Sequence, residues 1–222
     1  MKVNYGVNNV SYETFLRLPE EKKENVIRQG LLEFSLKNYQ DANTDLICKA
    51  CGISKGSLYH YFGNKKNFYL FLLSYSIRTF ESVRKNSCGE GEGFYDVLFC
   101  DLNSKLNMYQ THPNEVALLT MAAKEQCGEV FEEKNELLKS SMQHIRSADE
   151  ALLKAAFSRV ALREGIDPAL ALDALNLYLE ALRMRYMERY RNKPYAFYEN
   201  REKIKEELRR YLDLFLNGVA KR

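Results

Sequence analysis

The side chains that could do the most specific chemistry lie between residues 44 and 65. They offer hydroxyl, phenol, imidazole and ammonium groups around one glycine, at Thr44, Lys55, Gly56, Ser57, Tyr59, His60, Tyr61 and Lys65. Such groups bind the phosphates of a nucleic-acid backbone and the base edges of a major groove. Three lysines against Asp45 give this stretch a formal charge of +2, which is positive but not extreme. We therefore expect residues 44–65 to contact double-stranded DNA.

Two short helices joined by a tight turn must position these groups. Asn43 and Thr44 are good N-caps for a first helix that runs to Cys51, and Ser54 is a good N-cap for a second helix. Gly52 fits the crowded turn between them because it has no Cβ. The inward positions are apolar, at Ile47, Cys48, Cys51, Leu58 and Phe62. The pattern predicts a helix-turn-helix whose second helix is short enough to enter a major groove.

Several of these side chains allow a second interpretation. Tyr59 and Tyr61 could be core aromatics, but the inward positions are already filled, which favours DNA contact. His60 fits a base-reading role and an ordinary surface position about equally well. Lys65 and Lys66 could be solvated helix charge, and phosphate contact is favoured for Lys65 alone.

Cys48 and Cys51 form a C-x-x-C pair, which raises the question of a metal or redox site. On a helix this spacing puts both thiols on the same inward face. A structural zinc site needs four ligands, and no second pair lies nearby in the sequence. We interpret the two thiols as small core residues, with a thiol switch in the DNA-binding segment as the alternative. We expect no metal and no cofactor.

The composition of the whole chain bounds its class. The 222 residues are 45% hydrophobic, and a net charge of +3 is too small to coat the surface, so any DNA contact must be local. Five cysteines without a repeated framework indicate reduced thiols. The N-terminus lacks the apolar run of a signal peptide, and no apolar run approaches the ~20 residues of a membrane helix. We expect a cytoplasmic protein with no membrane partner.

Helical spacing recurs along the whole chain and predicts an all-α fold. After an arm at 1–16, we expect helices near 18–37, 44–51, 54–61, 65–85, 94–111, 114–127, 130–164, 168–191 and 198–218. Residues 87–93 contain three glycines and are the clearest linker. The expected domains are an N-terminal arm and helix-turn-helix at 1–64, a connecting helix and linker at 65–93, and an effector-binding and dimerisation domain at 94–222.

The region after the linker has several side chains on or beside apolar stripes that could line a ligand site. Core packing is the default interpretation for each of them. His112 is the best candidate, because it precedes Pro113 at a helix junction, where pockets often form. The candidate ligand contacts are Met108, Tyr109, His112, Met121 and His144.

The final predicted helix carries an apolar stripe that one domain could not easily cover alone. Its members are Leu208, Tyr211, Leu212 and Phe215. We expect these residues at a contact between two subunits, and we expect Phe215→Glu to give monomers.

The run from Ile47 through Gly52 to Lys65 resembles the DNA-binding signature of the tetracycline-repressor (TetR/AcrR) family, and the similarity extends over about residues 18–72. One departure is Gly30, where the family usually has alanine, at a cost of ~1 kcal/mol to the helix. The resemblance implies a dimeric, all-helical regulator with three N-terminal helices on DNA and C-terminal helices that bind an effector. It also implies that the last two helices pair with their copies in a four-helix interface.

The resemblance also implies individual roles. The positions that match phosphate-contacting residues of the family are Thr44, Lys55, Tyr59, Tyr61 and Lys65. The positions that match residues near base edges are Lys55, Gly56, Ser57 and His60.

These observations favour a DNA-binding homodimer that acts as a transcriptional regulator, with repression the expected sign. A small and largely apolar effector would release it from a near-palindromic operator. The alternative is a helix-turn-helix dimer whose C-terminal domain only dimerises or recruits a protein partner. An enzyme is not expected, because the sequence offers no Ser/His/Asp grouping, no phosphate-binding glycine loop and only three scattered histidines.

Overall fold

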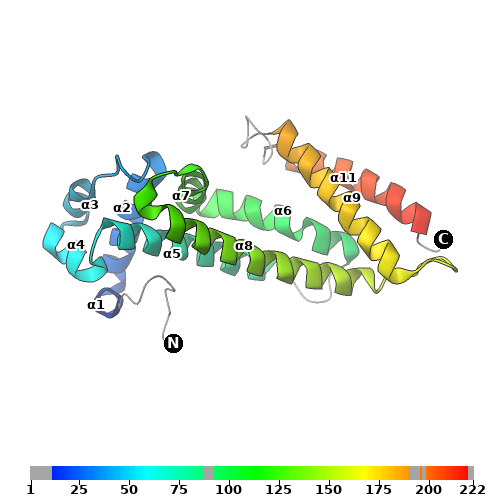
Figure 1. The fold of residues 1–222 in the computed structure, drawn as a ribbon, viewed down its shortest axis with the longest axis horizontal. Helices are drawn as coiled ribbons and strands as arrows, with labels where there is room; N and C mark the ends of the chain where they lie inside the picture. Colours follow the sequence, from blue (N-terminus) through cyan, green and yellow to red (C-terminus); the bar gives the residue numbers. More distant parts are fainter. Residues whose placement is uncertain (1–11, 88–92, 191–195, 197–198, 220–222) are drawn as a thin grey trace. The chain divides into compact units, whose positions relative to one another are not determined.

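The computed structural model describes residues 12–87, 93–190, 196 and 199–219, and every regular element there is a helix. The helices are α1 (Glu13–Leu16), α2 (Glu20–Leu36), α3 (Thr44–Cys51), α4 (Lys55–Phe62), α5 (Lys65–Ser87), α6 (Phe94–Thr111), α7 (Pro113–Lys124), α8 (Gly128–Phe157), α9 (Pro168–Arg189) and α11 (Arg201–Val219) (Figure 1). The all-α prediction is confirmed. In the described part of the chain, no helix is long and apolar enough to cross a membrane.

Local capping explains why the helix boundaries follow the sequence so closely. Asp167 accepts a hydrogen bond from the Ala169 amide at 2.9 Å, and Pro168 occupies the first turn of α9. Two expectations were wrong in detail. The helix expected near 18–37 begins at Glu20, with Pro19 as its N-cap. The helix expected over 130–164 ends at Phe157, after which turn hydrogen bonds such as Val160 N to Phe157 O replace the helical pattern.

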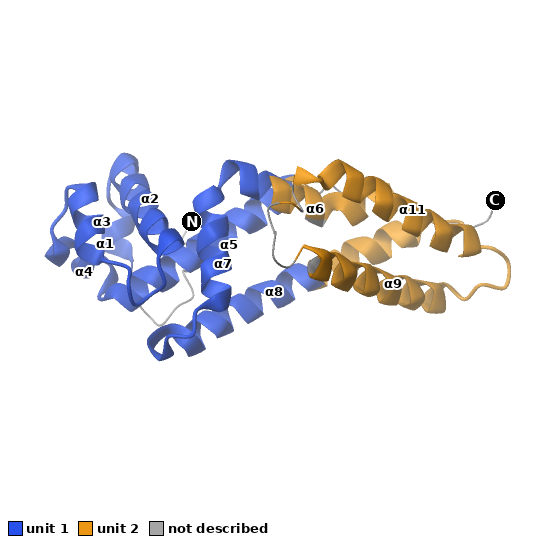
Figure 2. Ribbon diagram, turned by 90° about the horizontal axis from the view of Figure 1, so that it is seen from above, with its two compact units in different colours: residues 1–86, 107–146 blue, residues 87–106, 147–222 orange. Residues whose placement is uncertain are grey.

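The chain divides into two compact units that are not continuous in sequence. Unit 1 comprises residues 1–86 and 107–146, and unit 2 comprises 87–106 and 147–222 (Figure 2). Helices α6 and α8 therefore contribute residues to both units. The division differs from the linear boundaries expected after 64 and 93, because α5, α7 and the first half of α8 bury side chains in one core with the N-terminal helices. The functional division into those three segments stays a prediction.

An aromatic cluster forms the centre of unit 1. The ring centroid of Phe62, at the end of α4, lies 4.5 Å from that of Phe68, 4.8 Å from Phe15 and 5.0 Å from Phe71. Residues 68–73 of α5 are all buried, as expected for a helix surrounded by other elements. The arm expected at 1–16 is partly structural, because Phe15 of α1 is buried in this cluster. Residues 1–11 of that arm lie outside the described residues.

Gly30 allows α2 to approach α5 closely. A Cβ added at this position would lie 2.6 Å from the Phe68 ring and 2.7 Å from Leu72 Cδ1. Distances under about 3 Å are not tolerated by close-packed side chains, so a larger residue would force the helices to shift. The glycine that looks unfavourable in the sequence is therefore required by packing.

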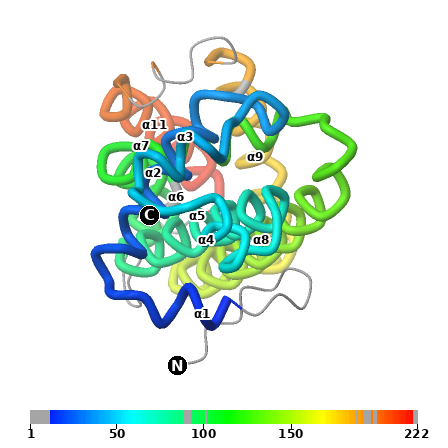
Figure 3. Tube along the Cα trace, turned by 90° about the vertical axis from the view of Figure 1, so that its left-hand side faces the viewer, coloured from blue at the N-terminus to red at the C-terminus, as the bar shows by residue number. Residues whose placement is uncertain are grey.

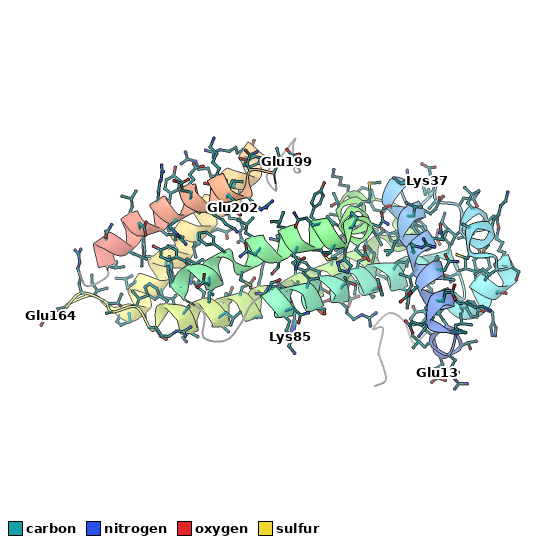
Figure 4. All side chains as sticks on the ribbon, turned by 180° about the vertical axis from the view of Figure 1, so that it is seen from behind. Glu13, Lys37, Lys85, Glu164, Glu199 and Glu202 are labelled. Carbon is teal, nitrogen blue, oxygen red and sulfur yellow. The ribbon has the colours of Figure 1, made fainter. Side chains whose placement is uncertain are left out.

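Unit 2 contains an antiparallel pair of helices, α9 and α11. Glu164 and Glu202, labelled in Figure 4, lie near opposite ends of this pair, and the Arg163 amide donates to the Val219 carbonyl at 2.9 Å. Unit 2 has two hydrophobic clusters. One contains Leu153, Phe157, Ala171, Leu175 and Leu212, and the other contains Leu102, Tyr186 and Ile204. Cys100 is disulfide-bonded, so the expectation of reduced thiols is wrong for this residue, whereas Cys48, Cys51 and Cys127 are free.

Candidate nucleic-acid interface

The turn between α3 and α4 has the geometry that the sequence predicts. The Asn43 side chain caps α3 by accepting from the Asp45 amide at 2.8 Å, and Ser54 caps α4 by accepting from the Ser57 amide at 3.0 Å. Gly52 ends α3 with φ of 66°, a left-handed conformation that disfavours residues with a Cβ. These local hydrogen bonds fix the start of α4.

Helix α4 presents two different faces. Leu58 and Phe62 are 0% exposed and anchor the helix in the core of unit 1. Lys55, Gly56 and His60 are exposed, while Ser57 is half-buried. Figure 3 is viewed from the side on which α3 and α4 lie in Figure 1, and α4 lies toward the viewer. The outward face of α4 is therefore open, as the sequence predicts.

The two tyrosines of α4 lie at the edge of the core. The Tyr59 hydroxyl lies 3.4 Å from the Thr44 hydroxyl, and the Tyr61 ring centroid lies 6.0 Å from that of Phe15. Both tyrosines are half-buried, so each one packs on the core and keeps an exposed edge. The two interpretations offered by the sequence, core aromatic and surface residue, are each partly right.

Thr44 differs from expectation. It is only 6% exposed, and its hydroxyl faces the Tyr59 hydroxyl and not an open surface. The N-cap role that the sequence allowed for Thr44 belongs to Asn43. A direct phosphate contact by the Thr44 hydroxyl is therefore poorly supported, because the side chain has almost no accessible surface.

Lys55 has a partner that sequence reasoning missed. Its Nζ lies 3.0 Å from Asp45 Oδ1 and 3.1 Å from Asp45 Oδ2, and 5.9 Å from the centre of the Tyr59 ring. The hydrogen bond and the charge of Asp45 raise the pKa of Lys55. The sequence did hold a signal for this pair, because Asp45 lies in the first turn of α3 and Lys55 begins α4.

The two lysines that begin α5 have different surroundings. Lys65 Nζ donates to the Gln40 carbonyl at 3.1 Å and lies 4.9 Å from the centre of the Tyr39 ring. Lys66 forms an ion pair with Glu133 of α8 at 2.7 Å. Lys66 is therefore engaged by a carboxylate and Lys65 by a carbonyl and a ring, and the phosphate contact expected for Lys65 stays a prediction.

Comparison with known proteins identifies this segment. Residues 26–70 match the family described as "Bacterial regulatory proteins, tetR family". The curated transcriptional regulator AcuR of Cereibacter sphaeroides is 44% identical over 50 residues, which are 22% of this chain and 23% of that protein. The match thus spans less than a quarter of the curated relative.

Residues 26–70 are thus similar to the N-terminal segment of TetR-family regulators. Solved structures extend the likeness of fold beyond the matched segment. A TetR-family transcriptional regulator from Chloroflexus aurantiacus J-10-fl is 21% identical with a TM-score of 0.54, covering 95% of this chain and 98% of that one. The flavonoid-responsive regulator FrrA is 22% identical with a TM-score of 0.56, covering 92% of this chain and 100% of that one.

A hydrogen-bonded junction holds the turn at residues 39–41, which precedes α3 and α4. The Tyr39 amide donates to Glu125 Oε2 at 2.7 Å, and the Tyr39 hydroxyl donates to Glu129 Oε1 at 2.7 Å. Burial and the bond to Glu129 raise the pKa of Tyr39 far above its usual value. No sequence signal predicts these contacts, because the partners are 86 and 90 residues apart.

Lys134 closes the other side of this junction. It is buried, and its Nζ donates to the carbonyls of Ala122 at 2.9 Å and Glu125 at 3.0 Å, at the C-terminal end of α7. A cation is favourable there because the helix dipole puts negative potential at this end. Burial lowers the pKa of Lys134, and the nearby Glu125 carboxylate opposes that shift.

The five predicted ligand contacts do not share one environment. Met108 is fully buried, His112 is half-buried with Nδ1 2.6 Å from the Thr111 hydroxyl, and His144 is exposed on α8. Tyr109 and Met121 are half-buried. All five lie in unit 1, in the same compact unit as the helix-turn-helix, although the sequence placed them in a separate C-terminal domain.

The predicted dimer residues of α11 are more involved in their own subunit than expected. Leu212 is 1% exposed, so its side chain is a core residue and its assignment to the interface is corrected. The Phe215 ring stacks on Tyr178 at 5.8 Å, and the Tyr178 hydroxyl donates to the Tyr211 carbonyl at 3.1 Å. Leu208 packs beside Ile204 and Tyr186.

A second apolar face lies on α9, a helix that the resemblance implied at the subunit contact, although none of the residues of this face was named for it. Leu170, Leu177 and Met184 are 67%, 68% and 59% exposed, and they recur every seven residues. Ala174 and Ala181 lie between them on the same face of the helix. The heptad recurrence was the available signal, but buried residues on the opposite face of α9 obscured it.

The C-x-x-C pair behaves as core packing. Cys48 is buried, and Cys51 is half-buried with Sγ 3.8 Å from the Asn25 carbonyl. Burial, reinforced by the neighbouring thiol, raises the pKa of Cys51 to about 11, and burial also raises that of Cys48. Thiols held in the protonated form react slowly, which argues against a redox switch here. No cluster of metal-ligating side chains occurs among the described residues.

Proposed function

We propose that this protein is a TetR-family regulator of transcription, which inserts α4 into the major groove of an operator. The observation that carries the proposal is the contrast between the two faces of α4. Leu58 and Phe62 lock the helix to the core, while Lys55, Gly56 and His60 face outward. A rigidly held helix with an open, polar and cationic face is the arrangement that reads base edges and binds phosphates.

The contacts divide by chemistry. Lys55 and Lys65 carry ammonium groups that bind phosphates, and the exposed edges of Tyr59 and Tyr61 offer hydroxyl groups to the same backbone. Gly56, Ser57 and His60 lie where a groove would approach the helix most closely, and we assign them to base edges. Gly56 favours such an approach because no Cβ intervenes.

We further propose that two copies associate through α9 and α11. Leu170, Leu177 and Met184 form a stripe with the spacing of helices that pair lengthwise, and small alanines between them permit close approach. Leu214 of α11, at 70% exposed, is a further exposed apolar side chain on unit 2. Such a dimer would place two copies of α4 on half-sites about 34–36 Å apart or somewhat more.

Control by a small molecule completes the proposal. One fold relative is described as flavonoid-responsive, which supports a small and largely apolar effector here, with repression as the sign. Such an effector acts only if it binds the DNA-competent and DNA-incompetent conformations with affinities that differ by ~1–3 kcal/mol. The site of action is the cytoplasm, where the operator is found.

A selection experiment tests the DNA-binding function. The full-length protein would be mixed with a random-sequence 30-base-pair duplex pool, and the retained duplexes sequenced. We expect a near-palindromic consensus, and we expect Lys55→Gln to reduce the slope of log affinity against log salt by about one. Lys139→Gln, the same charge change on an exposed residue of α8, is the matched control. Retention of no duplex by the wild type would refute the proposed function.

A further inference from the structure

Asp45 lies at a position where a negative charge opposes DNA binding. It is in the first turn of α3, its side chain is 61% exposed, and it is the only acidic residue between 44 and 65. Both of its carboxylate oxygens lie within 3.1 Å of Lys55 Nζ. In the absence of DNA, the charge of Lys55 at the start of α4 is therefore balanced by the Asp45 carboxylate.

We propose that Asp45 is a specificity-determining residue, which withholds Lys55 from the phosphates of arbitrary DNA and aims it when the operator is bound. The inference rests on the proposed function, because it concerns how α4 reads DNA. Non-specific affinity comes almost entirely from lysine and arginine contacts to phosphates. An ion pair that must open before Lys55 can reach a phosphate lowers this non-specific affinity.

The geometry explains why the operator loses less than other sequences. Lys55 Nζ is held between the Asp45 carboxylate and the Tyr59 ring, so the long side chain is already ordered in one direction. Ordering a lysine side chain costs conformational entropy, and the tether removes part of this cost only for a duplex that presents an acceptor along the held direction, which we infer for the operator. The quantity that matters biologically is the ratio of operator to non-specific affinity, which Asp45 increases.

Asp45 also has a structural role that must be separated from this one. A carboxylate in the first turn of a helix interacts favourably with the positive end of its dipole. The cap of α3 is Asn43 and not Asp45, so Asp45→Asn retains the capping hydrogen bond at the Asp45 amide. Thermal melting by circular dichroism measures the dipole effect, and affinity for two duplexes measures the effect on specificity.

The experiment compares wild type, Asp45→Asn, Lys55→Gln and the double variant on two DNA probes. One probe is a duplex recovered from the random 30-base-pair pool by the wild type, and the other is a scrambled duplex of equal composition. For Asp45→Asn we expect roughly 5–10-fold tighter binding to the scrambled duplex at low salt, with a salt slope steeper by about one. The gain on the selected duplex should be smaller, so the specificity ratio should fall about threefold or more.

Two controls isolate the ion pair. In the Lys55→Gln background, Asp45→Asn should leave the specificity ratio unchanged, because the cation that it controls is gone. Asp41→Asn removes one negative charge from the turn before α3, where Asp41 accepts from the Asn38 amide group at 2.7 Å, and should also leave the ratio unchanged. Asp45→Ser is a second variant in case the asparagine fails to fold.

The outcomes are distinguishable. Equal changes on both duplexes, or a ratio unaffected by Asp45→Asn and Asp45→Ser, would overturn the inference while leaving DNA binding intact. If the specificity ratio falls as much in Asp41→Asn as in Asp45→Asn, the effect comes from the loss of any negative charge in this region, and the inference is also overturned. A wild-type protein that retains no duplex refutes the proposed function itself.

Discussion

Helices α4 and α9 both bury one face and expose the other, but their exposed faces have opposite chemistry. Around α4 the exposed side chains are lysine, imidazole and glycine, whereas along α9 they are leucine and methionine at heptad spacing. A polyanion is the natural ligand of the first surface and a second apolar helix that of the second. The comparison puts the proposed recognition surface and the proposed assembly surface on separate helices, which belong to separate compact units.

The largest expected effect follows from breaking the α9 surface. Leu177→Glu should convert the dimer to a monomer, because it places a charge in the middle of the apolar stripe. Loss of bivalent binding should weaken operator affinity about 100-fold or more. Sedimentation velocity and titration of the selected duplex measure the two effects. The matched control is Leu36→Glu on α2, where an equally exposed leucine, at 72%, lies outside the stripe. A dimeric Leu177→Glu protein would move the interface away from α9.

A smaller effect is expected at the edge of the α4 surface. Lys65→Ala should weaken operator binding about 3–10-fold and lower the salt slope by about one, because one phosphate contact is lost. Fluorescence anisotropy at several salt concentrations gives both values. Lys139→Ala should change neither. If Lys65→Ala leaves the slope unaltered, Lys65 serves only to hold the Gln40 carbonyl and the Tyr39 ring.

Removal of two tyrosine hydroxyls, one in each unit, tests whether the two units unfold independently of each other. Tyr39→Phe removes the bond to Glu129 and should cost about 1–2 kcal/mol, since the acceptor is charged. Tyr178→Phe removes the bond to the Tyr211 carbonyl and should cost about 1 kcal/mol. Hydrogen exchange should quicken near α3 in the first variant and near α11 in the second. Quickening in the opposite unit would show that the two regions unfold together.

The smallest effect is a pH dependence. The pKa of Cys51 is about 11 in the folded protein, above the ordinary thiol value, so the folded state retains a proton that the unfolded state loses. Stability from this group is therefore complete below pH ~8 and is lost as the pH rises through about 9–11. The difference in free energy of unfolding between wild type and Cys51→Ala, measured in urea, should become smaller as the pH rises. A constant difference would contradict the raised pKa.

The sequence predicts the helices of this protein well because their boundaries depend on local chemistry. The side chains of Asn43, Ser54 and Asp167 each accept a hydrogen bond from an amide within three residues, and Gly52 ends α3 through its left-handed backbone, so a reader of the sequence can find all four. The open face of α4 follows from the same local pattern. Gly30 shows the limit, since it looks like a defect until α5 is placed against it.

The features that escaped prediction depend on contacts between distant segments. Tyr39 meets Glu125 and Glu129 only in the folded chain, and the burial of Thr44 depends on where Tyr59 lies. The exposed stripe of α9 was hidden for a different reason. Both faces of that helix are apolar, so periodicity alone cannot say which one faces the core. The resemblance implied both of the last two helices at the subunit contact, but the residues named for that contact were all on α11, where Leu212 proves to be internal.

The carboxylate of Glu125 has a mechanical consequence. One oxygen accepts the Tyr39 amide at 2.7 Å, and the other accepts the amides of Gln126 at 2.9 Å and Cys127 at 2.8 Å. A single carboxylate thus links the turn before α3 to the bend between α7 and α8. A small displacement of one segment relative to the other would leave amides without an acceptor. The carboxylate therefore favours two discrete conformations, bonded and released, over a continuous range.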